Sequence, residues 1–405
     1  MTHPSAARSD PRASAALLLL AYVAFVSIGL PDTVLGVAWP SLRSTFDLPQ
    51  AWLAAPLATG AATYFLSGLL AGRLMVRLGI GRLLAASTAL AAAGVLGFGL
   101  APAFVAFLLC GAIVGFGSGA VDAALNTYVA RHFAARHMTW LHAAYAAGAA
   151  VGPALMTALL ARELSWRVGY LVIGTLLAFL AFAFFLSRHL WAAGAAQVLV
   201  DAPGGHGSAP VEPPTTAWAA LRHGNVRLQI ATFFLYSGVE VTAGQWSYTI
   251  LTEARGVDDT TAGGFVTLYW GGLLAGRVLS GFVVERVGNE RLLRIATACA
   301  VVAAAGFAVP ALPPALSAAA LALLSFSLAP IYPGLMAETP RRVGGATPHA
   351  VGFQVSAATF GIAAVPAMAG AIGTELGLNA IGPLLALCAV LLWLLHERLV
   401  ARTRA

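Results

Sequence analysis

Long runs of apolar residues, separated by short polar segments, dominate the chain. A run of about 20 apolar residues is long enough to cross a lipid bilayer as a helix. Twelve runs meet this length, at residues 16–40, 51–71, 82–101, 104–130, 139–160, 166–188, 227–251, 260–284, 291–311, 313–336, 349–373 and 377–399. The pattern predicts an all-α membrane protein with twelve transmembrane helices.

Only one connection between these runs is long. Residues 189–226 include the Gly- and Pro-rich stretch 202–208 and the sequence Glu212-Pro213-Pro214. Such composition is typical of a flexible linker. Because it falls at the middle of the chain, we expect an N-terminal six-helix bundle at 1–188, a cytoplasmic linker at 189–226 and a C-terminal six-helix bundle at 227–405.

The composition supports this class and excludes others. Of the 405 residues, 59% are hydrophobic and 10% are charged, whereas an average soluble domain has about 25% charged residues. This fraction of charged residues is too low for the solvated surface of a soluble protein and too low for a disordered chain. All 23 basic residues are arginine and lie mostly in short loops, which does not favour nucleic-acid binding.

No motif for catalysis or for a cofactor is apparent. The three cysteines, Cys110, Cys299 and Cys388, each lie inside an apolar run without CxxC spacing, so neither a metal site nor a disulfide framework is expected. We find no nucleophile–base pair, zinc ligand set or phosphate-binding loop. The chain is therefore not expected to be an enzyme or to need a cofactor.

The arginines predict the orientation in the membrane. If both termini are inside, 18 arginines lie on the cytoplasmic side, and Arg43, Arg162, Arg167 and Arg255 lie outside. The positive-inside rule then indicates a multi-pass protein of the cell inner (plasma) membrane with cytoplasmic termini. The polar residues 1–14 are interpreted as a cytoplasmic tail, because the apolar run after them is too long for a signal peptide.

Two loops share one pattern, Gly-x-x-x-x-Arg-x-Gly. The first copy contains Gly72, Arg77 and Gly79, and the second contains Gly281, Arg286 and Gly288 at a constant offset. Each copy follows the second helix of a predicted half. Two similar halves are typical of transporters built from parallel repeats.

With these loops the chain resembles the major facilitator superfamily over nearly its whole length. The loop signature of that family is similar to Gly-x-x-x-Asp-Arg-x-Gly-Arg-Arg/Lys. Val76 replaces the acid in the first copy, and Glu285 occupies its place in the second. The resemblance implies a monomer whose halves rock around a central site. It also implies a latch of the outward-open state that uses Arg77, Glu285 and Arg286.

A narrower resemblance is to the fucose–proton symporters and their sugar-transporting relatives. It is carried by Asp122-x-x-x-Asn126 after Gly115-x-Gly117-x-Gly119, by Gly148-x-x-x-Gly152-Pro153, and by Gly352-Phe-Gln354-Val-Ser356. This resemblance implies a sugar substrate and a proton as the coupling ion.

Ionisable residues inside a membrane are costly and are therefore functional candidates. Asp122 and Asn126 share a helix face, which the glycines before them continue, and carboxylate and amide groups suit the hydroxyls of a polyol. We expect Asp122, and Asp32 beside Pro31, to take part in proton coupling and Asp122 also in substrate binding. Each carboxylate could instead be a structural acid bonded to a neighbouring helix.

The second half offers a constellation typical of sugar sites. Glu240 is a candidate for both proton coupling and substrate binding, and Gln245 and Trp246 would complete a substrate site in which polar groups bind hydroxyls and a ring covers the C–H face. Neutral candidates for substrate binding are Gln354, Tyr64 and Tyr269.

Two further charges lie inside the runs. Arg277 is expected to pair with Glu240 or Asp122, or else to reach the interface by snorkelling. His142 could relay protons or could be an interface residue.

These features predict a secondary transporter that moves a small polar solute, most simply a sugar or polyol, by proton-coupled symport with alternating access. The alternative is a proton-coupled drug or metabolite efflux antiporter. Gly148-x-x-x-Gly152-Pro153 also resembles the fifth-helix signature of that group, although Leu155 and Met156 stand where two more glycines are usual.

Overall fold

The computed structural model describes residues 11–133, 135–191 and 216–404. In these ranges the chain is helical and has no strand. The first bundle contains α1 (Pro11–Phe46), α2 (Ala54–Leu78), α3 (Ile80–Leu100), α4 (Phe104–His132), α5 (Ala135–Leu160) and α6 (Trp166–Ser187). The second contains α9 (Gly224–Thr249), α10 (Asp259–Val287), α11 (Asn289–Phe307), α12 (Pro314–Leu328), α13 (Ile331–Val343), α14 (Thr347–Leu376) and α15 (Ile381–Arg404).

Short helices lie between these long ones. They are η1 (Gln50–Leu53), α8 (Ala217–Arg222), the π-helical turn η3 (Ile250–Ala254), η4 (Gly344–Ala346) and η5 (Leu378–Ala380). Helix α8 lies inside the segment predicted as a linker, and α9 begins at Gly224. Residues 192–215 of the predicted linker lie outside the described residues.

All twelve predicted spans correspond to long helical segments, which confirms the predicted fold class. The span at 313–336 differs in detail, because it divides into α12 and α13 next to Pro330 and extends to Val343. In the described residues, ten segments are long and apolar enough to cross a membrane by composition alone. Helices α9 and α11 are not among the ten. Polar groups explain this: Glu240 and Gln245 in α9, and Arg291 and Arg294 in α11.

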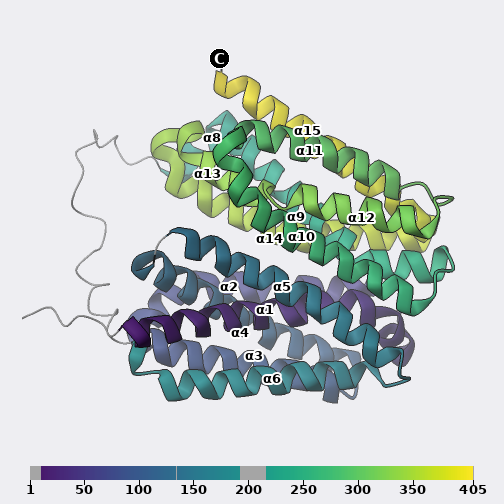
Figure 1. The fold of residues 1–405 in the computed structure, drawn as a ribbon, viewed down its shortest axis with the longest axis horizontal. Coiled ribbons are helices and arrows are strands. Elements are labelled where there is room, and N and C mark those ends of the chain that lie inside the picture. The colour runs from purple at the N-terminus through teal and green to yellow at the C-terminus, as the bar shows by residue number, and fades with distance from the viewer. Residues whose placement is uncertain (1–10, 134, 192–215, 405) are drawn as a thin grey trace, which may run out of the picture.

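The two bundles lie one above the other in Figure 1, with α1–α6 in purple to teal and α9–α15 in green to yellow. In the first bundle α1 packs on α5, α2 on α4, and α3 on α4 and α6; in the second α9 packs on α14, and α12 on α10 and α11. The bundles meet along α5 and α10, α2 and α14, and α1 and α9. The functional cavity is expected along these shared helices.

The repeat predicted from the two loops is visible in the backbone. Gly79 ends α2 with φ 75°, and Gly288 ends α10 with φ 82°. Positive φ is readily adopted only by glycine, since it has no Cβ. The next helix, α3 or α11, starts at the following residue in both cases. The matching turns support a duplicated architecture.

The bundles are closed against each other at the end where α1 terminates. We call this the outer end, following the predicted orientation, and the opposite end the inner end. Arg43 donates hydrogen bonds of 3.0 and 2.8 Å to the two carboxylate oxygens of Glu253, and Gln50 donates one of 2.7 Å. A Cβ on Gly36 would lie 2.8 Å from the main-chain oxygen of Gln245. These contacts join α1 to the end of α9.

The inner end is packed less tightly. A Cβ added at Gly68 or Gly72 in α2, or at Gly352 in α14, would meet no heavy atom within 4 Å. These positions lie toward the inner ends of α2 and α14, two helices that contact each other across the bundles. The three inner glycines thus border open space, whereas the contacts of Gly36, Arg43 and Gln50 close the bundles against each other at the outer end.

Candidate functional site

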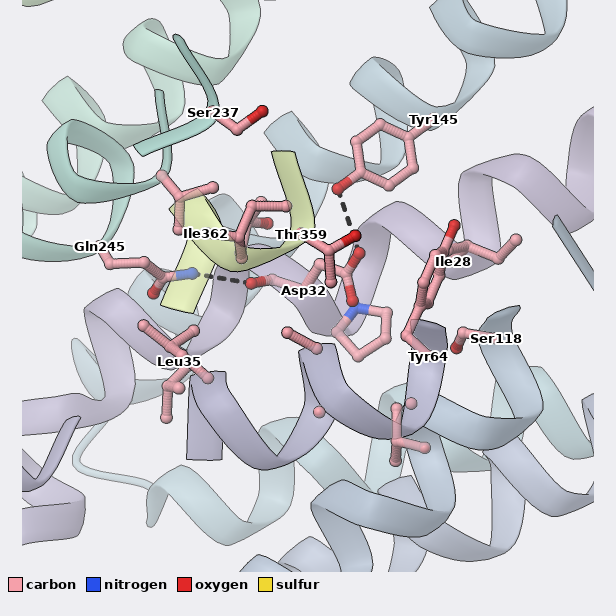
Figure 2. A pocket seen from close by; sticks show the side chains of 18 of the residues that line it. Ile28, Asp32, Leu35, Tyr64, Ser118, Tyr145, Ser237, Gln245, Thr359 and Ile362 are labelled. Carbon is pink, nitrogen blue, oxygen red and sulfur yellow. Dashed lines mark hydrogen bonds between the residues drawn. The ribbon is translucent and has the colours of Figure 1, made fainter. Parts of the chain in front are cut away.

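A cavity of about 400 Å³ lies between the two bundles. Helices of both bundles line it, and Figure 2 shows Asp32, Tyr64 and Tyr145 from the first bundle facing Ser237, Gln245 and Thr359 from the second. Sites for small ligands usually measure about 300–1,000 Å³ and combine apolar walls with a few polar groups. The cavity therefore has the size and position of a substrate site.

Asp32 projects from α1 into this cavity. The hydroxyl of Tyr145 in α5 donates a 3.0 Å hydrogen bond to its carboxylate. The side-chain amide of Gln245 in α9 donates a 2.8 Å bond to its main-chain oxygen (Figure 2). Gln245 therefore lines the cavity and also links the two bundles.

Asp122 lines the cavity from α4, next to the hydroxyl of Tyr64 in α2. The amide of Asn126 donates 3.0 Å hydrogen bonds to the Asp122 carboxylate and to its main-chain oxygen. Asn126 is thus engaged within its own helix and is not among the residues that line the cavity. It orients Asp122 in this conformation, whereas the sequence analysis placed it in the substrate site.

The glycines before Asp122 lie against α2, and one of them, Gly115, also lines the cavity. A Cβ on Gly115 would lie 2.2 Å from the oxygen of Gly60, and one on Gly119 would lie 2.3 Å from the oxygen of Tyr64. Both contacts are with the backbone of α2. The glycines therefore let α4 pack closely on α2, a common role for small residues in membrane helices.

Glu240 and Arg277 form an ion pair at the cavity wall. The guanidinium Nη2 of Arg277 lies 3.8 Å from Glu240 Oε2, and the hydroxyl of Tyr236 donates a hydrogen bond to the same carboxylate. Of the two partners proposed for Arg277 from the sequence, the structure selects Glu240. Arg277 also donates a 3.4 Å hydrogen bond to the main-chain oxygen of His142.

His142 lines the cavity from α5. Its ring meets the ring of Phe25 edge-on at 5.7 Å between centroids. The imidazole therefore lies at the cavity wall rather than at a lipid-facing interface.

Three more predicted substrate residues lie, like Asn126, outside the cavity lining. Trp246 is buried, and its indole donates to the main-chain oxygen of Pro366 in α14 at 3.1 Å. The hydroxyl of Tyr269 donates to the main-chain oxygen of Glu240 at 2.7 Å. Gln354 is buried and bonds Thr339 at 3.0 Å. These contacts hold α9, α10, α13 and α14 together, so the three residues support the site without lining it.

The predicted latch residues occupy the inner ends of α2 and α10. Arg77, Glu285 and Arg286 are all exposed. In the part of the chain that the structure describes, none of the three takes part in an ion pair. An unformed latch fits the open packing at this end.

Sequence reasoning missed several aromatic residues of the cavity, namely Tyr145, Tyr236, Trp270 and Tyr332. Tyr236 lies four residues before Glu240, and Tyr145 lies three residues after His142, so helical spacing places each beside a recognised charge. Tyr332 carries no such signal, because no ionisable residue of its run was singled out.

The charges of the site divide into two kinds. Glu240 has a cationic partner in Arg277, whereas Asp32 and Asp122 have hydroxyl and amide partners. Aromatic rings supply apolar surface beside them. Among the described residues no cluster of potential ligands could hold a metal ion. The arrangement can bind hydroxyl groups and accept protons on two carboxylates.

Comparison with solved structures shows similar folds. The chain matches a mutant of the nucleoside transporter NupG with a TM-score of 0.76 and 15% identity, covering 95% of this chain and 99% of that one. It matches a bacterial homologue of the lysosomal transporter Spinster, inward-facing and unoccupied, with a TM-score of 0.73 and 15% identity, covering 97% and 99%. It matches the transporter FucP, in the outward conformation, at 0.59 and 17%, covering 96% and 99%.

Comparison of sequences gives the family. Bypass of stop codon protein 6 of Saccharomyces cerevisiae is 25% identical over 281 residues, which are 65% of this chain and 56% of that protein. The chain thus spans little more than half of the length of this curated relative. Residues 21–366 match the family model of the Major Facilitator Superfamily. With the twelve-helix fold and the central cavity, this match shows that the chain belongs to the Major Facilitator Superfamily of membrane transporters.

Proposed function

We propose that the protein is a proton-coupled symporter for a small, uncharged, polyhydroxylated solute, with a sugar or polyol as the substrate class. The observation that carries this proposal is the placement of Asp32 and Asp122. Both carboxylates line one cavity between the bundles, and neither has a cationic partner among the described residues.

The two carboxylates account for the coupling ion. An ionised carboxylate at membrane depth is costly unless it is paired or hydrated. When a proton and the solute both occupy the cavity, the charge of Asp122 or Asp32 is removed and water is displaced. The loaded halves can then close at the outer end and open at the inner end. Glu240, which forms an ion pair with Arg277, is assigned to substrate binding.

The lining accounts for the substrate class. Carboxylate and amide oxygens accept hydrogen bonds from hydroxyls, and tyrosine hydroxyls both donate and accept. Tyr64, Tyr145 and Gln245 lie beside Asp32 in one part of the cavity (Figure 2). Aromatic rings such as that of Trp270 can cover the apolar face of a sugar ring. FucP, to which the fold is similar, belongs to the branch that the sequence resembles.

The proposal includes the predicted placement in the membrane. Both termini and the segment 189–226 lie in the cytoplasm, the protein is a monomer in the cell inner membrane, and the two six-helix bundles move as units. The sealed outer end then corresponds to an inward-facing state.

A second candidate is efflux of a cationic drug or metabolite in exchange for protons. The same observation favours it, because two carboxylates without cationic partners beside aromatic rings also attract an organic cation. This reading requires that a cation and protons compete for Asp32 and Asp122.

Uptake into proteoliposomes distinguishes the two functions. Purified protein is reconstituted and an inward proton gradient is imposed, with radiolabelled hexoses, pentoses, polyols and nucleosides outside. The proposal predicts that one class accumulates above its external concentration and that a protonophore abolishes this. Expulsion of a cationic dye under an inward gradient, without uptake of any neutral solute, would establish the antiporter instead.

A further inference from the structure

A second cavity lies on the side of the first bundle that faces away from the second bundle. It is a groove of about 680 Å³ between α3 and α6, which lie at the lower edge of Figure 1. Alanines form most of it, with the buried Ala85, Ala92 and Ala181 at its base. The groove has no helix of the other bundle beside it, so in a membrane it faces lipid.

The side chains along the groove follow two regular stripes. On α3 the stripe runs from Arg82 to Leu96, and on α6 it runs from Ala178 to Arg188. The members recur at intervals of three or four residues, with an adjacent residue at some positions, which keeps them on one helix face. Both stripes end in an arginine at the inner end. The two arginines therefore stand at the same mouth of an otherwise apolar channel.

Among the described residues, neither arginine of this basic mouth takes part in an ion pair. Neither α3 nor α6 contains an aspartate or glutamate, and none occurs at 48–121 or 164–200. The guanidinium of Arg188 donates a 2.6 Å hydrogen bond to the main-chain oxygen of Phe185 and lies 4.2 Å from the centroid of its ring. Phe185 thus holds the guanidinium group of Arg188 beside the groove.

The dimensions match one leaflet of the bilayer. From Arg82 to Leu96 the stripe rises about 21 Å at 1.5 Å per residue, whereas half of the hydrocarbon core is about 15 Å thick. A lipid chain lying against the alanines would run from the inner headgroup region to beyond the bilayer midplane. The exposed rings of Phe182 and Phe185 form one wall of this path.

From these observations we infer that the groove between α3 and α6 is a binding site for one anionic phospholipid of the inner leaflet. An acyl chain occupies the alanine-lined channel, and Arg82 and Arg188 bind the phosphate-bearing headgroup. Arginine binds phosphate oxygens through several N–H groups at once. This site does not depend on the identity of the transported solute.

Native mass spectrometry of the delipidated protein, titrated with phosphatidylglycerol or phosphatidylcholine, tests the inference. The first phosphatidylglycerol should bind more tightly than the first phosphatidylcholine. The double variant Arg82→Gln/Arg188→Gln should weaken phosphatidylglycerol binding about tenfold, from the electrostatic contribution of each arginine near an anionic lipid, whereas Arg82→Lys/Arg188→Lys should retain most of it. Filling the groove with Ala89→Leu/Ala93→Leu should weaken binding of both lipids.

Arg398→Gln provides the matched control, because Arg398 is an exposed arginine near the inner end of α15 in the other bundle. It should leave the first binding event unchanged. Equal affinity for the two lipids, or unchanged phosphatidylglycerol binding in the double glutamine variant, would overturn the inference. A dimer of the unaltered protein that dissociates in the Ala89→Leu/Ala93→Leu variant would also overturn the inference. The groove would then be an interface between copies of the chain.

Discussion

The hydroxyl of Tyr145 donates a 3.0 Å hydrogen bond to the carboxylate of Asp32, and this bond ties α5 to α1 at the wall of the central cavity. The ring of the same tyrosine lies 6.0 Å from the guanidinium of Arg277, which in turn approaches Glu240. One aromatic side chain thus stands between an acid of the first bundle and the ion pair of the second. A change of charge at Asp32 is therefore placed to affect both bundles.

The first prediction concerns the coupling role of Asp122. The substitution Asp122→Asn removes the titrating group but keeps the shape of the side chain and its contact with Asn126. We expect accumulation driven by a proton gradient to fall at least about tenfold, as is usual when an essential proton-transfer group is lost. Exchange of labelled for unlabelled solute should remain, because exchange needs no net proton movement.

Uptake and exchange measured on the same proteoliposomes check this expectation. The control is Asp47→Asn, which removes a carboxylate next to the end of α1, outside the cavity. Full gradient-driven accumulation by the Asp122→Asn variant would remove Asp122 from the coupling step.

The second prediction concerns the pair of Glu240 and Arg277. Removing one partner leaves the other charge alone in a mostly buried place, since these side chains are 13% and 15% exposed. We expect Glu240→Gln and Arg277→Gln each to lower stability by about 1–3 kcal/mol, by analogy with buried pairs. The double variant should lose less stability than the sum of the losses in the two single variants. Denaturation of the four proteins in detergent measures the coupling, and strictly additive losses would argue against a direct pair.

The third prediction concerns the closure at the outer end. Arg43 and Glu253 join the bundles there, and both side chains are partly exposed, so the pair contributes about 1 kcal/mol. Arg43→Gln should therefore shift the ratio of outward-open to inward-facing molecules about fivefold. Spin labels in the outer loops of each bundle should show a larger fraction of long distances.

The pair of Arg294 and Glu397 offers a matched control for this experiment. It is also a partly exposed ion pair, with 2.6 Å between nitrogen and oxygen, but it lies within one bundle. Arg294→Gln should leave the distance distribution unchanged. If both substitutions change it equally, the outer ion pair has no special part in closure.

The fourth prediction concerns Gly36, which lets α1 approach α9. A Cβ at this position would lie 2.8–2.9 Å from the backbone of Gln245, closer than atoms of this kind can pack. Gly36→Leu should hold the outer end open and reduce transport at least about tenfold, because the closed state would require overpacking of a tight contact. In Gly264→Leu, near the outer start of α10, the new side chain begins in open space, so transport should persist. Transport by the Gly36→Leu variant at the rate of the unaltered protein would show that this contact is dispensable.

The fold could be predicted from the sequence because each crossing leaves a run of apolar residues, whatever its neighbours are. Helix α9 could be predicted as a transmembrane helix even though Glu240 and Gln245 lower its hydropathy. The length of its mainly apolar run between two polar segments was sufficient for this prediction. The break next to Pro330 between α12 and α13 was missed, since both pieces belong to one apolar run.

The site could be predicted only in part. Charged residues such as Asp32, Asp122 and Glu240 were identified because a charge is costly in a membrane. Gln245 and Trp246 show where this reasoning stops. Successive residues point about 100° apart on a helix, so Gln245 reaches Asp32 while Trp246 bonds Pro366. Which of the two lines the cavity depends on neighbouring helices, which the sequence of one helix does not specify.

The central claim is that protons and a neutral solute move together, and direct observation of proton flow tests it best. Proteoliposomes that contain a pH-sensitive dye are prepared with equal pH on both sides, and the solute identified by uptake is added outside. The account predicts acidification of the lumen on addition of that solute and none in the Asp32→Asn/Asp122→Asn variant. Solute entry without any change in luminal pH would contradict the account and establish uniport.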